Sequence, residues 1–171
     1  QEAAAVAAQL TGVLGLRGVT GVRLLNRYDV EGMDDALFAR CISTVFSEPQ
    51  TDDVAFEMPD DCGYVVAVEY LPGQYDQRAD AAEQCVQLIS QGERPTVRTA
   101  RVYIIHGTLS PKELSRVKAY LINPVECREA AKDLPRTLKT DYPAPPPPGT
   151  LTGFTLLSDD GLAPLVAQYG L

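Results

Sequence analysis

The chain has 171 residues, a formal net charge of −8 and a sequence pI of about 4.6. This length suits one domain or a compact domain with an appendage, and the 45% hydrophobic content is that of a globular protein. The acidic balance argues against nucleic acid and against a membrane as main partners, and no apolar run has the length of a membrane span.

Four cysteines and one histidine limit the metal and nucleophile chemistry of the sequence. Cys41, Cys62, Cys85 and Cys127 form no CxxC pair, and His106 is the single histidine. Zinc sites need closely spaced ligand pairs, so we expect buried free thiols of a cytoplasmic protein and no metal site. No Ser or Cys motif surrounds His106, and no Gly-rich phosphate loop is present.

The first half of the chain predicts a helix, a strand and a second helix. Residues 2–16 carry apolar side chains at helical spacing, and residues 21–32 read as a strand that ends at Gly32. Residues 33–46 again have helical spacing, with acidic residues suited to the first turn. The pattern breaks at Pro49.

The second half predicts a strand, a helix, a strand and a helix. The strands are residues 64–72 and 96–107, and the first helix is residues 77–90. The last helix follows Ser110, which is a good N-cap with Glu113 at capping-box spacing.

An internal repeat relates the two halves at an offset of 75 residues, and the elements agree better than the identities do. The strand 64–72 has no counterpart, because its equivalent positions fall before residue 1. We therefore expect the opening strand of the first copy to be missing. The identical pairs include Ala4 and Ala79, Ala7 and Ala82, Gln9 and Gln84, Val22 and Val97, Arg23 and Arg98, Tyr28 and Tyr103, Gly32 and Gly107, Pro49 and Pro124, and Ala55 and Ala130.

These patterns predict an α+β fold of two similar two-layer halves related by a pseudo-twofold axis. Each half should have a mainly antiparallel sheet with helices packed on one face. Residues 1–142 form this duplicated region, and the proline-rich residues 143–150 form a stiff linker. Residues 151–171 are too few to bury a core of their own, so they either dock on the main domain or open a further domain.

One polar stretch lies between the strand 64–72 and the helix 77–90. In the simpler interpretation Asp76 caps the helix and the next residues form its exposed first turn. In the alternative, amide, carboxylate and guanidinium groups at a helix N-terminus hold an anion or another domain. The candidate residues, expected to face another domain or a channel, are Gln74, Asp76, Gln77, Arg78 and Asp80.

The sequence resembles the start of the long, single-chain phosphoribosylformylglycinamidine synthase, the glutamine- and ATP-dependent amidotransferase (C–N ligase) of purine biosynthesis. The likeness covers nearly the whole chain. It is carried, in order, by LLNRYDVEG, TVFSEPQTDDV, VEYLPGQYDQRADAAEQCVQLISQGERPTVRTARVY, INPVECREA and LTGFTLL.

The resemblance implies two fused copies of the enzyme's small S subunit, followed by the start of a helical linker domain at residues 151–171. It implies a non-catalytic role in the cytoplasm, holding the synthetase and glutaminase domains of the parent chain together so that ammonia passes between them. Catalytic residues, ATP and Mg²⁺ then belong to the rest of the parent, and this fragment carries no cofactor. An uncovered sheet edge predicts that the fragment self-associates.

A second hypothesis stays open. A paired α+β module can act alone as a regulatory domain that senses a small metabolite between its two copies. The synthase hypothesis requires that the parent gene continue past residue 171 and encode a glutaminase, whereas the regulatory hypothesis is favoured if the gene stops there. An independent enzyme is disfavoured, because the sequence lacks nucleophile, metal and phosphate motifs.

Overall fold

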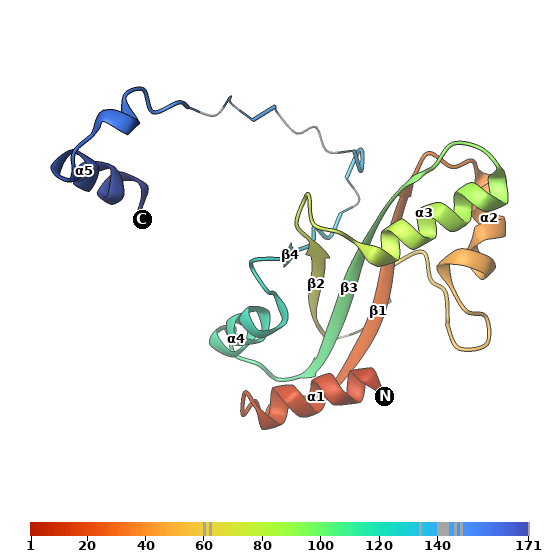
Figure 1. Ribbon diagram of the computed structural model, residues 1–171. Coiled ribbons are helices and arrows are strands. Elements are labelled where there is room, and N and C mark those ends of the chain that lie inside the picture. The colour runs from red at the N-terminus through yellow and green to blue at the C-terminus, as the bar shows by residue number, and fades with distance from the viewer. Residues whose placement is uncertain are drawn as a thin grey trace. The chain divides into compact units, whose positions relative to one another are not determined.

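The computed structural model describes residues 1–59, 61, 63–133, 135–139, 144, 145, 147 and 149–170. The chain forms two compact units, residues 1–140 and 141–171, both drawn in Figure 1. Cys62, and residues 143, 146 and 148 of the expected linker, lie outside the described residues.

The first unit alternates helices and strands, which confirms the predicted α+β class (Figure 1). Its first helix ends at Gly12, earlier than predicted, and the chain then turns through Gly15, whose φ is +65°. The elements are α1 (Glu2–Gly12), β1 (Val19–Glu31), α2 (Asp35–Cys41), the π-helical turn η1 (Ile42–Phe46), β2 (Tyr64–Tyr70), α3 (Gln77–Ser90), β3 (Thr96–Gly107), α4 (Pro111–Leu121) and β4 (Cys127–Glu129).

The four strands form one antiparallel sheet in the order β1-β3-β2-β4. We expected a sheet in each half, whereas the structure has a single sheet to which both halves contribute. The reason is that β1 and β3, the long strands of the two halves, pair with each other. Asn26 stands opposite Arg101 near the middle of this ladder.

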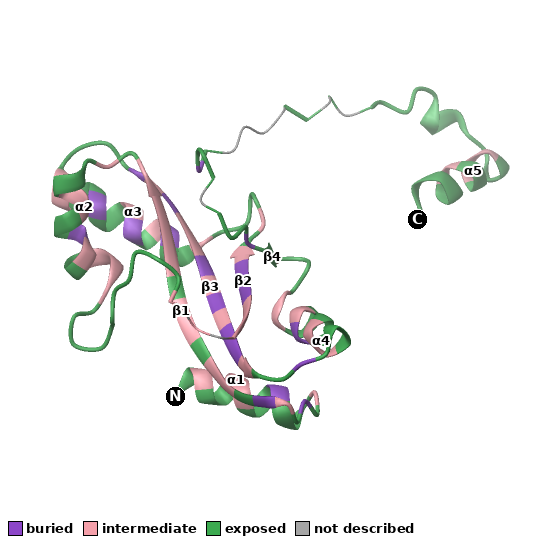
Figure 2. Ribbon diagram, turned by 180° about the vertical axis from the view of Figure 1, so that it is seen from behind, coloured by how far each residue is buried: buried purple, intermediate pink, exposed green. Residues whose placement is uncertain are grey.

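The helices pack on one face of the sheet and form two apolar clusters. The first joins α1 and α4 to the sheet through Leu10, Ile105 and Val117, all fully buried. The second joins α3 and η1 to the sheet through Ala79 and Val97 and through half-buried neighbours. Figure 2 shows buried stretches on the helices and on the central strands β2 and β3.

The opposite face of the sheet is crossed by the chain after β4. The backbone N–H of Ala130 donates to the carbonyl of Ala67 (2.8 Å), and Arg27 of β1 donates to the carbonyl of Ala131 (2.7 Å). Further along, the carboxylate of Glu31 accepts from the backbone N–H of Leu138 (2.6 Å). The small side chains at this crossing, with their buried apolar neighbours, are Ala67, Ala100, Val102, Ile104 and Ala130.

The second unit contains a short 3₁₀ turn η2 (Phe154–Leu156) and the helix α5 (Asp159–Tyr169), which Ser158 precedes as N-cap residue. None of its described residues is buried, as its short length predicts. Among the helices of the described residues, none has the length and hydropathy that crossing a membrane requires.

Candidate functional site

Asp76 lies at the start of α3, where the sequence predicts the N-cap. One carboxylate oxygen accepts from the backbone N–H of Ala79 (2.9 Å), so the predicted cap is confirmed. The other oxygen accepts from the backbone N–H of Thr99 (3.1 Å) and from its hydroxyl (2.8 Å). Thr99 is one residue beyond Ala100, where the β2–β3 ladder ends. Asp76 therefore holds α3 onto the sheet as well as capping it.

Asp80, on the first turn of α3, forms the centre of a network of charged and polar groups. Its carboxylate accepts from the hydroxyl of Tyr75 (2.9 Å) and the amide of Gln84 (2.7 Å), and it forms an ion pair with Arg94. The hydrogen bond from Arg94, followed by that from Tyr75, lowers the pKa of Asp80. The same bond to Asp80 raises the pKa of Tyr75. These contacts lie within the domain, so they give Asp80 a structural role.

Arg78 and Gln74 are exposed, and each donates a hydrogen bond to a distant part of the chain. The guanidinium of Arg78 donates to the hydroxyl of Tyr28 on β1 (3.3 Å), and this bond raises the pKa of Arg78. The amide of Gln74 donates to the carbonyl of Val125 (3.3 Å). Gln77 is exposed at the first position of α3.

The structure thus divides the five candidate residues into two groups. Asp76 caps the helix, as the simpler interpretation expects. Asp80, which that interpretation placed on an exposed first turn, is half-buried and holds the helix through its network. Gln74, Gln77 and Arg78 present amide and guanidinium groups at the surface, where another molecule or domain can reach them.

A second polar group, which sequence reasoning missed, lies on the helix-bearing face near the middle of the β1–β3 ladder. Arg101 forms an ion pair with Glu2 at the start of α1. Its Nε is buried and has no hydrogen-bond partner among the described residues. The negative charge of Glu2 also contributes to the pKa of Arg78 and to that of Tyr103, so these side chains lie close to Glu2. An N–H donor left without an acceptor can hold an oxygen of a carboxylate or phosphate ligand.

The signal for this group was weak in the sequence. Glu2 and Arg101 are 99 positions apart, and their contact depends on the pairing of β1 with β3. The available hint was that the offset of 75 residues aligns Asn26 with Arg101, two polar residues near the middle of the predicted strands.

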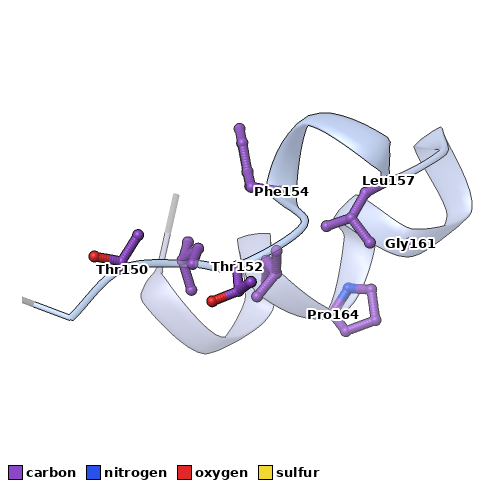
Figure 3. Close-up of a pocket in the computed structure, with 8 residues that line it drawn as sticks. Thr150, Thr152, Phe154, Leu157, Gly161 and Pro164 are labelled. Atoms are coloured by element: carbon purple, nitrogen blue, oxygen red, sulfur yellow. The ribbon is translucent and has the colours of Figure 1, made fainter.

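The second unit holds a shallow pocket of about 340 Å³ (Figure 3). Its only polar side chains are the hydroxyls of Thr150 and Thr152, and the rest of its lining is apolar or glycine. No lining residue can act as an acid, a base or a metal ligand, so the pocket offers packing surface and no chemistry.

The described residues contain no group of three or more His, Cys, Asp or Glu side chains placed to hold a metal. Of the three described cysteines, Cys41 is buried, Cys127 is half-buried and Cys85 is exposed, so the expectation that the thiols are buried was wrong for Cys85. Burial raises the pKa of Cys41, which makes it a poorer nucleophile.

Comparisons with protein families, curated proteins and solved structures gave no match to this chain.

Proposed function

We propose that residues 1–142 are a duplicated domain whose two copies are related by a pseudo-twofold axis. The order of elements supports this. At an offset of 75 residues, α1 (Glu2–Gly12) corresponds to α3 (Gln77–Ser90), β1 to β3, and α2 with η1 to α4. Gly32 directly follows β1 and Gly107 is the last residue of β3, and both have positive φ.

The register of the central ladder agrees with such an axis. Asn26 and Arg101 are equivalent positions of the repeat, and they stand directly opposite each other. The ladder extends five residues from this pair in both directions, to Gly21–His106 and to Glu31–Thr96. An axis through the Asn26–Arg101 pair exchanges β1 with β3.

The packing of the helices follows the same exchange. α1 and α4 share the first apolar cluster, and Arg116 of α4 donates to the carbonyl of Leu14 after α1 (2.8 Å). α3 and η1 share the second cluster. Exchange of the two copies would convert one cluster into the other, because α3 replaces α1 and α4 replaces η1.

From this architecture and the sequence resemblance, we infer that the chain is the non-catalytic N-terminal region of a phosphoribosylformylglycinamidine synthase. Its role is to organise the synthetase and glutaminase domains so that ammonia reaches the acceptor without loss to water. The pairing of Asn26 with Arg101, which are 75 positions apart, is the observation that carries the inference, because the resemblance implies two fused S-subunit copies. ATP and Mg²⁺ would act in the synthetase domain, outside these residues.

The surface around Gln77 and Arg78 is the part that we assign to contact with the other domains. Both side chains are exposed at the start of α3. A photo-crosslinking amino acid at position 77 of the full-length parent tests this assignment, with the exposed position 40 on α2 as control. We expect crosslinks from position 77 to the synthetase or glutaminase domain. Crosslinks confined to residues 1–171 would contradict the assignment.

A second candidate function is the sensing of a small anionic metabolite between the two copies. The unpartnered Nε of Arg101, near the proposed axis, favours it. Calorimetric titration of the chain with small carboxylates and with inorganic phosphate tests this function. Binding that is lost in Arg101→Gln and kept in Arg40→Gln would support a sensor, and absence of binding would exclude these ligand classes.

A further inference from the structure

The outer edge of β1 has no neighbouring strand among the described residues. β1 is 13 residues long, lies at the end of the sheet order and pairs with β3 on one side. An edge strand presents a row of backbone N–H and C=O groups that can pair with another strand. β3, its equivalent in the second copy, has partners on both sides.

The second copy indicates which part of β1 is open to a partner. There β2 pairs antiparallel with β3, from Tyr64 opposite Ile105 to Glu69 opposite Ala100. Subtracting 75 from the two β3 positions gives Val30 and Leu25 of β1. A strand in the same register would therefore run antiparallel to residues 25–30.

The second copy also has β4, which covers the far side of β2. β4 follows a turn in which the backbone N–H groups of Glu126 and Cys127 donate to the carbonyl of Asn123, at 3.1 and 2.7 Å. The residues 75 positions earlier make the same turn. The N–H groups of Thr51 and Asp52 donate to the carbonyl of Glu48, at 2.9 and 2.8 Å.

The turn in the first copy is thus formed, but the strand that should follow it is absent. Residues 52–54 correspond to β4, yet they are exposed and belong to no strand. Both ribbon views draw the loop that contains them on the outer side of β1 (Figures 1 and 2). Ala130 is 7% exposed beside β2, whereas its equivalent Ala55 is exposed.

The loop after this turn carries apolar side chains that stay largely exposed, although the ring centroid of Phe56 lies 6.4 Å from that of Phe38 on α2. Val54, Phe56 and Met58 alternate along it and are 50%, 76% and 49% exposed. Alternation with period two is the pattern of a strand that has one apolar face. Acidic residues flank these side chains in the sequence.

We propose that the space between β1 and residues 52–54 is a slot for an extended polypeptide strand from outside these 171 residues. The strand pairs antiparallel with residues 25–30 on one side and with residues 52–54 on the other. This inference rests on the proposed duplication. The residues of the strand that lie beside Asn26, Tyr28 and Val30 on the helix-bearing face are β-branched or aromatic, as Tyr64, Val66 and Val68 are in β2.

A peptide that copies β2 tests the slot on the whole 171-residue chain. The probe is a synthetic peptide with the sequence of residues 63–72, GYVVAVEYLP, with lysines added at both ends for solubility. We expect binding that slows hydrogen exchange at the backbone amides of residues 25–30 and 53–55. The control peptide has proline in place of the copies of Val66 and Val68, and we expect it not to bind, because proline removes N–H donors.

A matched pair of protein variants tests the second side of the slot. Ala55 corresponds to Ala130, whose N–H donates to Ala67 of β2. Ala55→Pro removes that donor from an exposed loop, so the urea midpoint of unfolding stays unchanged while the peptide binds about fivefold more weakly. Glu57→Pro, beyond the equivalent of β4, leaves the affinity unchanged.

Three results would overturn the slot proposal. They are no protection of residues 25–30, binding of the proline peptide as tight as that of the probe, or an affinity of Ala55→Pro for the probe equal to that of the unchanged chain. Protection of residues 25–30 in the free, monomeric chain would also overturn it, since the edge would then already be covered from within the chain. The proposed role in an amidotransferase is tested by a separate experiment, which measures catalytic rates in the full-length protein. Failure of the slot proposal would therefore not count against the proposed role.

Discussion

Asp76 accepts hydrogen bonds from both the backbone N–H and the hydroxyl of Thr99, while its other carboxylate oxygen caps α3. One side chain thus serves a helix end and the end of a strand ladder. A polar side chain that the turn itself does not require can still form several hydrogen bonds within the fold, as Asp76 does.

Asp76→Ala should destabilise the domain more than loss of an ordinary cap does. Loss of an N-cap costs about 1 kcal/mol, and an N–H donor at Thr99 left without its acceptor adds about 1–2 kcal/mol. The control is Asp34→Ala, because Asp34 caps α2 through a single bond to the N–H of Leu37. We expect unfolding free energies in urea to fall by about 2–3 kcal/mol for Asp76→Ala and about 1 kcal/mol for Asp34→Ala. Equal losses would contradict the second function of Asp76.

Gly32 and Gly107, which are 75 positions apart in the sequence, should respond differently to alanine. Gly107 has φ +124°, and a Cβ there would lie 1.9 Å from the carbonyl oxygen of Gly18. Gly32 has φ +89°, and the nearest atom to an added Cβ is 3.9 Å away, on Pro95. Gly32→Ala should therefore cost only backbone strain of about 1–2 kcal/mol. Gly107→Ala should cost more or prevent folding, and thermal melts that rank the two in the reverse order would refute the geometry.

The network around Asp80 should stabilise the domain above the pKa of an unfolded Asp, which is about 3.9. The hydrogen bonds from Arg94 and Tyr75 lower the pKa of Asp80 in the folded state. The stabilisation is therefore present at neutral pH and is lost as the pH falls through the folded-state pKa. Asp80→Asn should lower the urea midpoint at pH 7 and have a smaller effect near pH 3. Asp53→Asn, in an exposed loop, serves as control, and an effect of Asp80→Asn that grows toward acid would contradict this assignment.

Local signals in the sequence predicted the elements well. The N-caps at Asp76 and Ser110, with the capping box to Glu113, follow from residue types a few positions apart, and the structure has all of them. The strands 64–70 and 96–107 follow from runs of β-branched and aromatic residues.

The contacts that join distant residues could not be predicted in the same way. The single sheet depends on β1 pairing with β3, and no local pattern favours this pairing over separate sheets. The bond between Arg78 and Tyr28 and the ion pair between Glu2 and Arg101 both follow from that pairing. Asp76 binds Thr99, which lies one residue beyond the end of the β2–β3 ladder. The candidate residues were therefore found in the sequence, but their division into structural and exposed groups required the structure.

The most direct test of the central claim compares two rates in the full-length amidotransferase to which we propose this chain belongs, carrying Gln77→Ala and Arg78→Ala. Both residues are exposed, so in the isolated chain each change should alter stability by less than about 0.5 kcal/mol. Arg40→Ala on α2 is the control for loss of one exposed arginine. If these residues contact the other domains, synthesis supported by glutamine falls several-fold while synthesis supported by free ammonia is preserved. An unchanged ratio of the two rates, together with a sharp fall in the urea midpoint of the isolated chain, would contradict the account.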